Sequence, residues 1–308
     1  MTKVFIDGSA GTTGLRIRER LAGRKDLELL VLPEELRKDP SARADALNTS
    51  AVSFLCLPDD AAREAVSLVT SPDAVIIDTS TAHRTAEGWT YGFPELKGQR
   101  GKIVSSRRIA NPGCHASGFV SLVAPLVQAG LLNADVRLSC FSLTGYSGGG
   151  KKMISAYEAD DAPELFRAPR QYALGQVHKH MPEMAAVCGL RYAPVFCPIV
   201  APYYAGMEVT VTLTPYETAA TPEEIRQVYR DYYTSGLVHY AESPDEDGFL
   251  SAGAFAGRDD MEVSVYGTPD RILLVSRFDN LGKGASGAAI QNMNLVLGAE
   301  ESSGLVKG

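Results

Sequence analysis

The sequence contains few cysteines, and it has no long hydrophobic run. Its five cysteines show no Cys-x-x-Cys spacing, which disfavours both a disulfide framework and a zinc knuckle. The uncharged, largely apolar stretch at residues 192–207 contains three prolines and is shorter than a membrane-spanning helix. The N-terminus lacks the apolar core of a secretory signal. We therefore expect a cytoplasmic protein without a transmembrane segment.

The sequence also lacks an excess of positive charge. It carries 30 Lys and Arg residues against 37 Asp and Glu residues, which gives a net charge of -7. A chain of this charge has no general attraction for phosphate backbones or anionic lipids. We therefore expect neither a nucleic acid nor a membrane surface as a partner.

What is present is an ordinary globular composition, with 45% hydrophobic and 22% charged residues in a chain of 308, a length suited to two domains. Up to about residue 110, apolar runs alternate with helix-compatible stretches, as a parallel sheet flanked by helices requires. Beyond Gly113, strand-like segments are joined by fewer helices, which favours a largely antiparallel α+β domain. The expected strands are 3–7, 27–32, 52–57, 74–77, 136–143, 208–213, 237–240, 262–266 and 272–278, and the expected helices include 15–21, 58–69, 183–187, 221–235 and 288–297.

Three glycines at a regular spacing follow the first expected strand. Gly8, Gly11 and Gly14 stand between that strand and a helix that begins near Leu15. Glycines in this setting let the backbone approach a pyrophosphate, which binds free N–H groups and the positive end of the helix. The pattern favours dinucleotide binding over a turn without a ligand, and it predicts an α/β, Rossmann-like domain over residues 1–113. The candidate binding residues are Gly8, Ser9, Gly11, Thr12, Thr13 and Gly14.

The residues after the second expected strand leave the type of dinucleotide open. Glu34 or Glu35 would suit a ribose diol, whereas Arg37 and Lys38 would suit a 2′-phosphate. Solvated surface charges are the alternative interpretation of all four. These residues alone do not decide between NAD and NADP.

Cys114 is the one cysteine that the sequence places at the start of a helix. It follows Asn-Pro-Gly and precedes apolar residues at helical spacing from Val120 to Val127. A helix N-terminus lowers the pKa of a thiol and so raises the fraction of nucleophilic thiolate. Cys56 and Cys140 lie in strand patterns, where an inert buried thiol is expected. We predict that Cys114 is a nucleophile, with an inert thiol as the less favoured alternative.

Two imidazoles and a carboxylate lie within the six residues from His178 to Glu183. A metal site would need a further cluster of ligands, which the sequence does not supply, so we predict no metal. General acid or base catalysis needs only one imidazole, tuned and held by a neighbouring carboxylate. A polar surface loop is the alternative. Together with Cys114, the cluster favours an acid–base role for His178 or His180, supported by Glu183.

Two further glycine-rich segments are candidates for binding anions. Residues 145–152 combine a flexible backbone with Lys151 and Lys152, which suits a phosphate or a carboxylate. A flexible turn is the alternative. Residues 279–287 end the last expected strand and open the C-terminal helix, where an ordinary connection is the alternative.

The order of these motifs resembles that of N-acetyl-gamma-glutamyl-phosphate reductases of the shorter form, a semialdehyde dehydrogenase-like family. The likeness runs from Gly8 to about Leu297 and rests mainly on Asn-Pro-Gly-Cys at 111–114 and on His-x-His-x-Pro-Glu at 178–183. Asp-Thr-Ser-Thr-Ala-His-Arg at 78–84 also fits. The resemblance implies NADPH-dependent reduction of an acyl phosphate to N-acetylglutamate semialdehyde, in arginine biosynthesis, by a homo-oligomer (dimer or tetramer). The alternatives are another acyl-phosphate reductase, such as an aspartate-semialdehyde dehydrogenase, and a non-catalytic NADP-binding regulator.

The resemblance also implies a role for each domain. It makes residues 1–113 the NADPH-binding domain and residues 114–279 the catalytic and oligomerisation domain. The C-terminal helix within residues 280–308 is expected to return to the first domain.

The same resemblance implies roles for individual residues. It makes Cys114 the nucleophile and His180, in preference to His178, the acid–base group. It places Asn280 and Lys283 near the nicotinamide. The residues implied to bind NADPH are thus those of the glycine loop with Arg37, Lys38, Asn280 and Lys283, and Ser147 and Lys151 are implied to hold the phosphate or carboxylate of the substrate.

Overall fold

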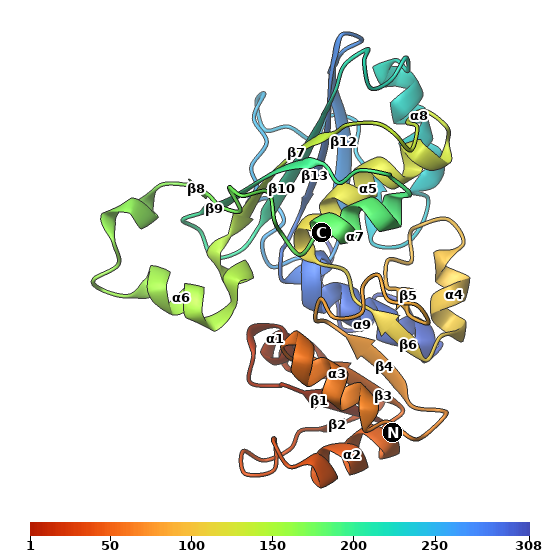
Figure 1. The fold of residues 1–308 in the computed structure, drawn as a ribbon, viewed down its shortest axis with the longest axis vertical. Helices are drawn as coiled ribbons and strands as arrows, with labels where there is room; N and C mark the ends of the chain where they lie inside the picture. Colours follow the sequence, from red (N-terminus) through yellow and green to blue (C-terminus); the bar gives the residue numbers. More distant parts are fainter. The chain divides into compact units, whose positions relative to one another are not determined.

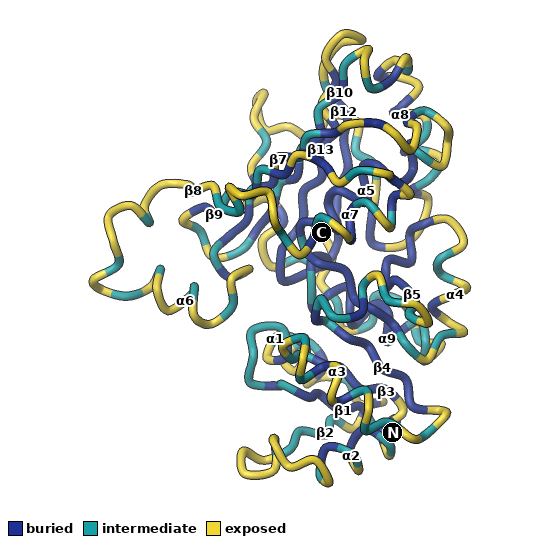
Figure 2. The backbone as a smooth tube through the Cα atoms, viewed as in Figure 1, coloured by how far each residue is buried: buried dark blue, intermediate teal, exposed yellow.

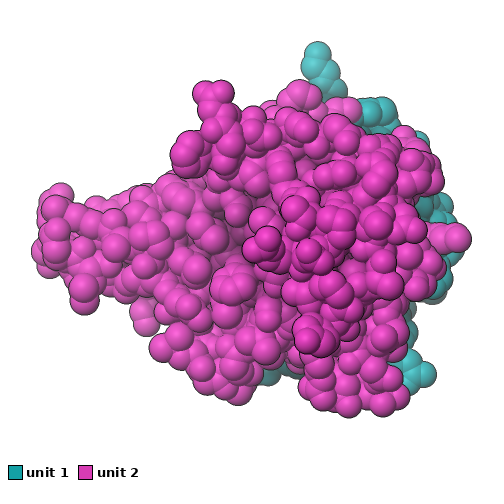
Figure 3. Space-filling view, turned by 90° about the horizontal axis from the view of Figure 1, so that it is seen from above, with its two compact units in different colours: residues 1–94, 98–112, 285–305 teal, residues 95–97, 113–284, 306–308 magenta.

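The computed structural model describes all 308 residues, and the chain forms two compact units, coloured separately in Figure 3. The first unit comprises residues 1–94, 98–112 and 285–305. The second comprises residues 95–97, 113–284 and 306–308. The C-terminal helix therefore belongs to the same unit as the N-terminal strands, as the sequence predicts.

The first unit contains a six-stranded sheet with the order β2-β1-β3-β4-β6-β5, in which every pair is parallel (Figure 1). Since β1 lies between β2 and β3, the loop after β1 lies at the carboxyl edge where the strand order reverses, the usual place for a ligand in such sheets. The strands are β1 (Thr2–Asp7), β2 (Leu27–Leu30), β3 (Val52–Leu55), β4 (Val75–Asp78), β5 (Thr90–Tyr91) and β6 (Arg108–Ala110). This arrangement confirms the predicted Rossmann-like fold.

Helices cover both faces of this sheet because its central strands are apolar on both sides. Alternate strand residues such as Val4 and Ile6 pack with α1, α4 and α9, while Phe5 packs with α2 and α3. The C-terminal helix is thus part of the hydrophobic core, through Ala289, Ile290 and Met293. The helices are α1 (Thr12–Leu21), α2 (Pro40–Thr49), α3 (Asp59–Ser67), α4 (Gln99–Ser105) and α9 (Gly287–Val296).

The second unit contains a seven-stranded sheet with the order β11-β12-β13-β10-β7-β9-β8. Most neighbouring strands are antiparallel, which confirms the prediction, but β7 pairs with β9 and β11 with β12 in parallel. The strands are β7 (Ser139–Gly145), β8 (Arg170–Gln171), β9 (Val195–Ala201), β10 (Met207–Leu213), β11 (Val238–Tyr240), β12 (Met261–Thr268) and β13 (Arg271–Phe278).

Helices α5 (Cys114–Gln128), α7 (Met181–Cys188) and α8 (Pro222–Tyr232) pack together, and α5 and α8 contact the sheet. A Cβ on Gly118 of α5 would stand 2.4 Å from Val209, so the missing side chain lets this helix lie close to β10. Helix α6 (Gly150–Glu158) lies outside this core and has no buried residue, as Figure 2 shows. No helix combines the length and the apolar run that crossing a bilayer would require.

The local signals in the sequence place several element ends within a few residues. Helix α8 begins after Thr221 with the capping box to Glu224 that the sequence predicts, although it ends at Tyr232 rather than near Ser235. Helix α7 starts at Met181, two residues before the predicted start. The strand predicted at 136–143 occupies residues 139–145, where it pairs with both β9 and β10.

Candidate active site

Cys114 is the first residue of α5, with Gly113 as its N-cap, so the predicted position at a helix N-terminus is confirmed. Residues 115–126 of this helix are all buried, which anchors its first turn in the core. The Gly113 N–H donates a hydrogen bond to Glu183 Oε1 at 2.8 Å. Glu183 lies in the first turn of α7, so this bond joins the turn of the thiol to the turn that follows the two histidines.

His178 and His180 lie next to each other directly before α7. Their ring centroids are 4.8 Å apart and nearly perpendicular. His180 is buried, whereas His178 is half-buried. The backbone N–H of His180 donates to His178 Nδ1 at 3.2 Å, so that nitrogen carries no proton and a neutral His178 holds its proton on Nε2. The predicted cluster of imidazoles and a carboxylate is therefore formed in one compact turn.

A third imidazole, that of His115, belongs to the same cluster and was missed by the sequence analysis. Its ring lies 5.8 Å from that of His178 and 5.5 Å from that of His180. Its Nδ1 is 2.6 Å from Ser142 Oγ and its Nε2 is 2.7 Å from the Tyr172 hydroxyl. Burial, followed by repulsion from the positive charge that His178 would carry when protonated and from that of Lys179, lowers the pKa of His115 to about 3, so this ring is neutral. The signal in the sequence was an imidazole next to the predicted nucleophile.

Tyr172 follows β8 and brings a phenol to the cluster. Burial, followed by the neighbouring Cys114, raises the pKa of Tyr172 above its ordinary value. A phenol in this state keeps its proton at any working pH. The group is therefore a hydrogen-bond donor near the thiol, and nothing in its local sequence pattern pointed to it.

The other thiols differ from Cys114 in their surroundings. Burial raises the pKa of Cys56 to about 12 and raises the pKa values of Cys140 and Cys188 as well. Cys140 is buried in β7, as expected, whereas Cys56 is half-buried and follows β3, and the raised pKa of each disfavours the reactive thiolate. Cys56, Cys114 and Cys197 are half-buried, and of these only Cys114 starts a helix.

The segment after β13 lies against the thiol. Residues 282–286 form one turn of π-helix, and a Cβ on Gly284 would stand 2.9 Å from the Cβ of Cys114. Just before this turn, Asn280 contacts Ser147, another residue of the predicted site. Asn280 accepts the Gly206 N–H at 3.0 Å and donates to Ser147 Oγ at 2.9 Å. Asn280 thus fixes the start of the glycine-rich loop at residues 145–152, and the roles predicted for Asn280 and Ser147 as ligands stay predictions.

Lys283 requires a correction. Its side chain has no exposed surface, and its Nζ lies 2.8 Å from both carboxylate oxygens of Glu95, which is also buried. Glu95 further accepts the Leu237 N–H at 3.0 Å. A fully buried ammonium paired in this way has no surface left for a nicotinamide, so the predicted contact is replaced by a structural ion pair. Lys151, by contrast, is exposed in the first turn of α6.

The glycine loop of the first unit is shaped by close backbone contacts. Gly8 has a φ of 80°, and a Cβ there would stand 2.3 Å from the Cys56 carbonyl oxygen. A Cβ on Gly14 would stand 2.5 Å from the Gly8 carbonyl oxygen. No side chain caps the N-terminus of α1, and the buried Thr12 Oγ1 has no hydrogen-bond partner within the protein. Open N–H groups and an unpartnered hydroxyl at this helix end fit the phosphates of a dinucleotide.

The residues proposed to choose between NAD and NADP lie in the loop after β2. Arg37 is half-buried and pairs with the exposed Glu34 at 2.7 Å, while Lys38 is exposed. An exposed ion pair of this kind is weak, so Arg37 is available to an anion. The positions therefore permit a 2′-phosphate contact, which stays a prediction.

The motif at residues 78–84 closes the carboxyl edge of the same sheet. Asp78 Oδ2 lies 2.6 Å from His83 Nδ1, and the His83 ring stacks on Trp89 at 4.0 Å. The next residue, Arg84, donates from Nε to the Asn111 carbonyl at 3.1 Å. This motif therefore supports the strand end that leads to Cys114 in the sequence.

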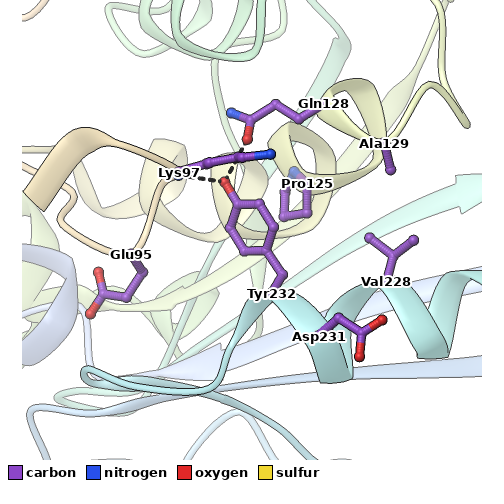
Figure 4. A pocket seen from close by; sticks show the side chains of 8 residues that line it. All are labelled: Glu95, Lys97, Pro125, Gln128, Ala129, Val228, Asp231 and Tyr232. Atoms are coloured by element: carbon purple, nitrogen blue, oxygen red, sulfur yellow. Dashed lines mark hydrogen bonds between the residues drawn. The ribbon is translucent and has the colours of Figure 1, made fainter.

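A pocket of about 430 Å³ lies in the second unit, at the C-terminal end of α5 (Figure 4). The Tyr232 hydroxyl accepts the Lys97 N–H at 2.8 Å and donates to Gln128 Oε1 at 2.9 Å. The lining residues are Glu95, Lys97, Pro125, Gln128, Ala129, Val228, Asp231 and Tyr232. None of the imidazoles and no cysteine lines this pocket, so it is separate from the candidate active site.

Comparison with known protein families assigns both parts of the chain. Residues 114–280 match the semialdehyde dehydrogenase dimerisation domain, and residues 32–103 match the semialdehyde dehydrogenase NAD binding domain. Among solved structures, aspartate semialdehyde dehydrogenase II from Vibrio cholerae, complexed with ASA, has a TM-score of 0.73 at 17% identity, covering 96% of this chain and 98% of that one. The enzyme from Candida albicans, with NADP, has a TM-score of 0.69 at 14% identity, covering 96% and 99%. At such identity the likeness concerns the fold.

Relatives of higher identity share one name. The N-acetyl-gamma-glutamyl-phosphate reductase of Sinorhizobium medicae is 47% identical over 307 residues, covering 96% of this chain and 99% of the relative. N-acetyl-gamma-glutamyl-phosphate reductase 2 of Pseudomonas putida is 43% identical, covering 98% of both chains. That of a Nostoc species is 45% identical, covering 98% and 99%. The chain belongs to the N-acetyl-gamma-glutamyl-phosphate reductase family.

Proposed function

We propose that this protein reduces N-acetyl-gamma-glutamyl phosphate to N-acetylglutamate 5-semialdehyde, with NADPH as reductant and release of phosphate, in arginine biosynthesis. The observation that carries the proposal is the position of Cys114 at the start of α5, joined through Gly113 and Glu183 to the turn that holds His178 and His180. Full-length identity of 43–47% to enzymes of that name supports the choice of substrate.

The residues of the second unit suit acyl transfer through sulfur. The Cys114 thiolate would attack the carbonyl carbon of the acyl phosphate, and backbone N–H groups at the start of α5 would stabilise the developing oxyanion. Loss of phosphate leaves a thioester on Cys114. NADPH, when bound, supplies the hydride that this thioester accepts. His180 would handle the proton as the resulting thiohemiacetal collapses to the aldehyde and releases the thiolate.

The residues of the first unit suit the cofactor. The glycine loop, with its uncapped helix N-terminus and the unpartnered Thr12 hydroxyl, would hold the pyrophosphate. Arg37 and Lys38 would hold the 2′-phosphate. We therefore propose residues 1–113 as the cofactor domain, residues 114–279 as the catalytic and oligomerisation domain, and residues 280–308 as the segment that completes the cofactor domain.

We further propose that the protein works as a homo-oligomer, either a dimer or a tetramer. The matched dimerisation domain supports association, and the sheet of the second unit leaves large apolar side chains exposed. Phe141 is 43% exposed, Val195 57% and Leu273 41%. On β7, Phe141 alternates with the buried Cys140 and Ser142, so these side chains belong to the face away from α5. A second copy of this chain would cover that face.

The proposed function is tested by running the reaction backwards. NADP⁺ reduction with N-acetylglutamate semialdehyde should require inorganic phosphate or arsenate and should far exceed the rate with aspartate semialdehyde. A preference for aspartate semialdehyde would instead support the other acyl-phosphate reductase. Binding of NADPH without turnover of either aldehyde would support a regulator.

Replacement of both Arg37 and Lys38 by alanine is expected to weaken NADPH binding by about tenfold or more and to leave NADH binding nearly unchanged. Two charge-assisted hydrogen bonds to the 2′-phosphate would be lost, and NADH has no such group. The measurement is the dissociation constant for each cofactor, from nicotinamide fluorescence. Lys102→Ala, an exposed lysine on α4, is the matched control. Equal weakening of both cofactors would show that other residues hold the 2′-phosphate.

His180→Asn is expected to lower turnover by about 10²- to 10⁴-fold, the usual contribution of general acid–base catalysis. His178→Asn should cost less, since one ring nitrogen of His178 is already occupied by the His180 N–H. Turnover of both variants is measured at saturating substrate, together with NADPH binding as a check on folding. A larger loss for His178→Asn would move the acid–base role to that residue.

A further inference from the structure

We infer that His115 is a positioning residue that, fixed between Ser142 and Tyr172, turns the Tyr172 hydroxyl into a hydrogen-bond donor for the Cys114 thiolate. The inference deepens the proposed function, because it concerns the same thiol. It rests on two buried polar groups, Ser142 and His115, and on the half-buried phenol of Tyr172, none of which any step of the proposed reaction uses.

Ser142 determines which nitrogen of the His115 ring is unprotonated. This residue lies on the helix-facing side of β7 and has no exposed surface. The only hydrogen-bond partner of its Oγ is His115 Nδ1, at 2.6 Å. A buried hydroxyl proton without an acceptor is costly, typically by about 1–3 kcal/mol. Ser142 therefore donates its proton to Nδ1, which must be the unprotonated nitrogen of the ring.

The proton of the His115 ring therefore lies on the other nitrogen, Nε2. His115 is neutral, because it is buried between two uncharged hydroxyls with no carboxylate partner, and its lowered pKa of about 3 agrees. A neutral imidazole with Nδ1 as acceptor carries its proton on Nε2. That N–H donates to the Tyr172 oxygen at 2.7 Å.

The bond from His115 determines where the hydroxyl proton of Tyr172 is directed. Its oxygen accepts from His115, so its own O–H proton is directed elsewhere, and no other group of the protein accepts it. Cys114 directly precedes His115 at the start of α5, which brings the thiol close to the phenol that His115 holds, and the raised pKa of Tyr172 beside Cys114 agrees. The remaining proton of Tyr172 is thus available to the thiolate. With the opposite tautomer of His115, the phenol would donate to the imidazole and the thiolate would lose this donor.

The inference is tested on the thiol itself, without substrate or cofactor, by the rate at which iodoacetamide alkylates Cys114 at pH 7. Tyr172→Phe should slow alkylation by about tenfold, since a hydrogen bond to a charged group is lost, although the greater intrinsic nucleophilicity of a more basic thiolate offsets part of the effect. Alkylation is followed by mass spectrometry of the Cys114 peptide in a Cys56→Ser/Cys197→Ser background, because Cys56 and Cys197 are the other half-buried thiols.

Two variants of His115 form a matched pair. The amide of His115→Gln reaches the position of Nε2 and keeps a donor for Tyr172, whereas the shorter amide of His115→Asn reaches only toward Ser142. We expect His115→Asn to slow alkylation as much as Tyr172→Phe, and His115→Gln to restore most of the rate. The double variant His115→Asn/Tyr172→Phe should be no slower than either single one, because both remove the same donor.

The outcomes separate positioning from mere packing. If His115→Asn and His115→Gln lower the thermal midpoint alike while alkylation stays at the wild-type rate, or if the effects multiply in the double variant, the inference is wrong. A ¹⁵N spectrum of histidine-labelled protein that shows the proton of His115 on Nδ1 would also overturn it. None of these readouts depends on the substrate, so they stay informative even if the assay with the semialdehyde fails.

Discussion

Cys114→Ser is expected to abolish reduction, with a loss in turnover of at least about 10⁴-fold, comparable to removal of the nucleophile in other enzymes of covalent catalysis. A serine hydroxyl is ionised far less than a thiol at neutral pH, and an oxygen ester is a poorer hydride acceptor than a thioester. Turnover is measured as the oxidation of NADPH in the presence of the acyl phosphate. Binding of NADPH should persist, since the glycine loop belongs to the other compact unit.

The control for this prediction is Cys197→Ser, which changes another half-buried thiol, on β9. It should keep near wild-type turnover. Substantial activity in Cys114→Ser would remove the thioester mechanism. Equal losses in both variants would point to a general effect on folding rather than to the nucleophile.

Lys283→Met should destabilise the protein by about 3–5 kcal/mol, because it removes the cation that neutralises the buried carboxylate of Glu95. The measurement is the shift of the urea midpoint, followed by circular dichroism. Some turnover should be lost as well, since Lys283 immediately precedes Gly284, which packs on Cys114.

The matched control is the double variant Glu95→Gln/Lys283→Met. An uncharged amide can still accept the Leu237 N–H, and no buried charge remains, so most of the lost stability should return. A double variant as unstable as Lys283→Met would show that the apolar stem of the lysine, and not its charge, holds this region.

The sequence predicted the features that depend on neighbouring residues. The rhythm of apolar strands, the glycines between β1 and α1, the capping box at Thr221 and the position of Cys114 at the start of α5 all follow from patterns of a few residues. Such local signals determine which element forms and where it begins, and they were sufficient for the fold class.

Features made by residues far apart in the sequence were not predictable in this way. Glu95 and Lys283 are separated by 188 positions, and Gly113 and Glu183 by 70. The glycine-rich segment around Lys283 gave no sign of this ion pair, and the family resemblance alone assigned the lysine to the cofactor. His115 was overlooked for the same reason, because its role depends on contacts with Ser142 and Tyr172, which lie far from it in the sequence.

The loop of residues 8–14 has a consequence for affinity. Gly8 packs closely on the Cys56 carbonyl and Gly14 on the Gly8 carbonyl, so contacts within the protein itself hold the shape of the loop. The entropy of ordering the loop is therefore lost during folding and not during association. A dinucleotide that binds this preorganised loop should therefore have a higher affinity than one that must first order a flexible loop.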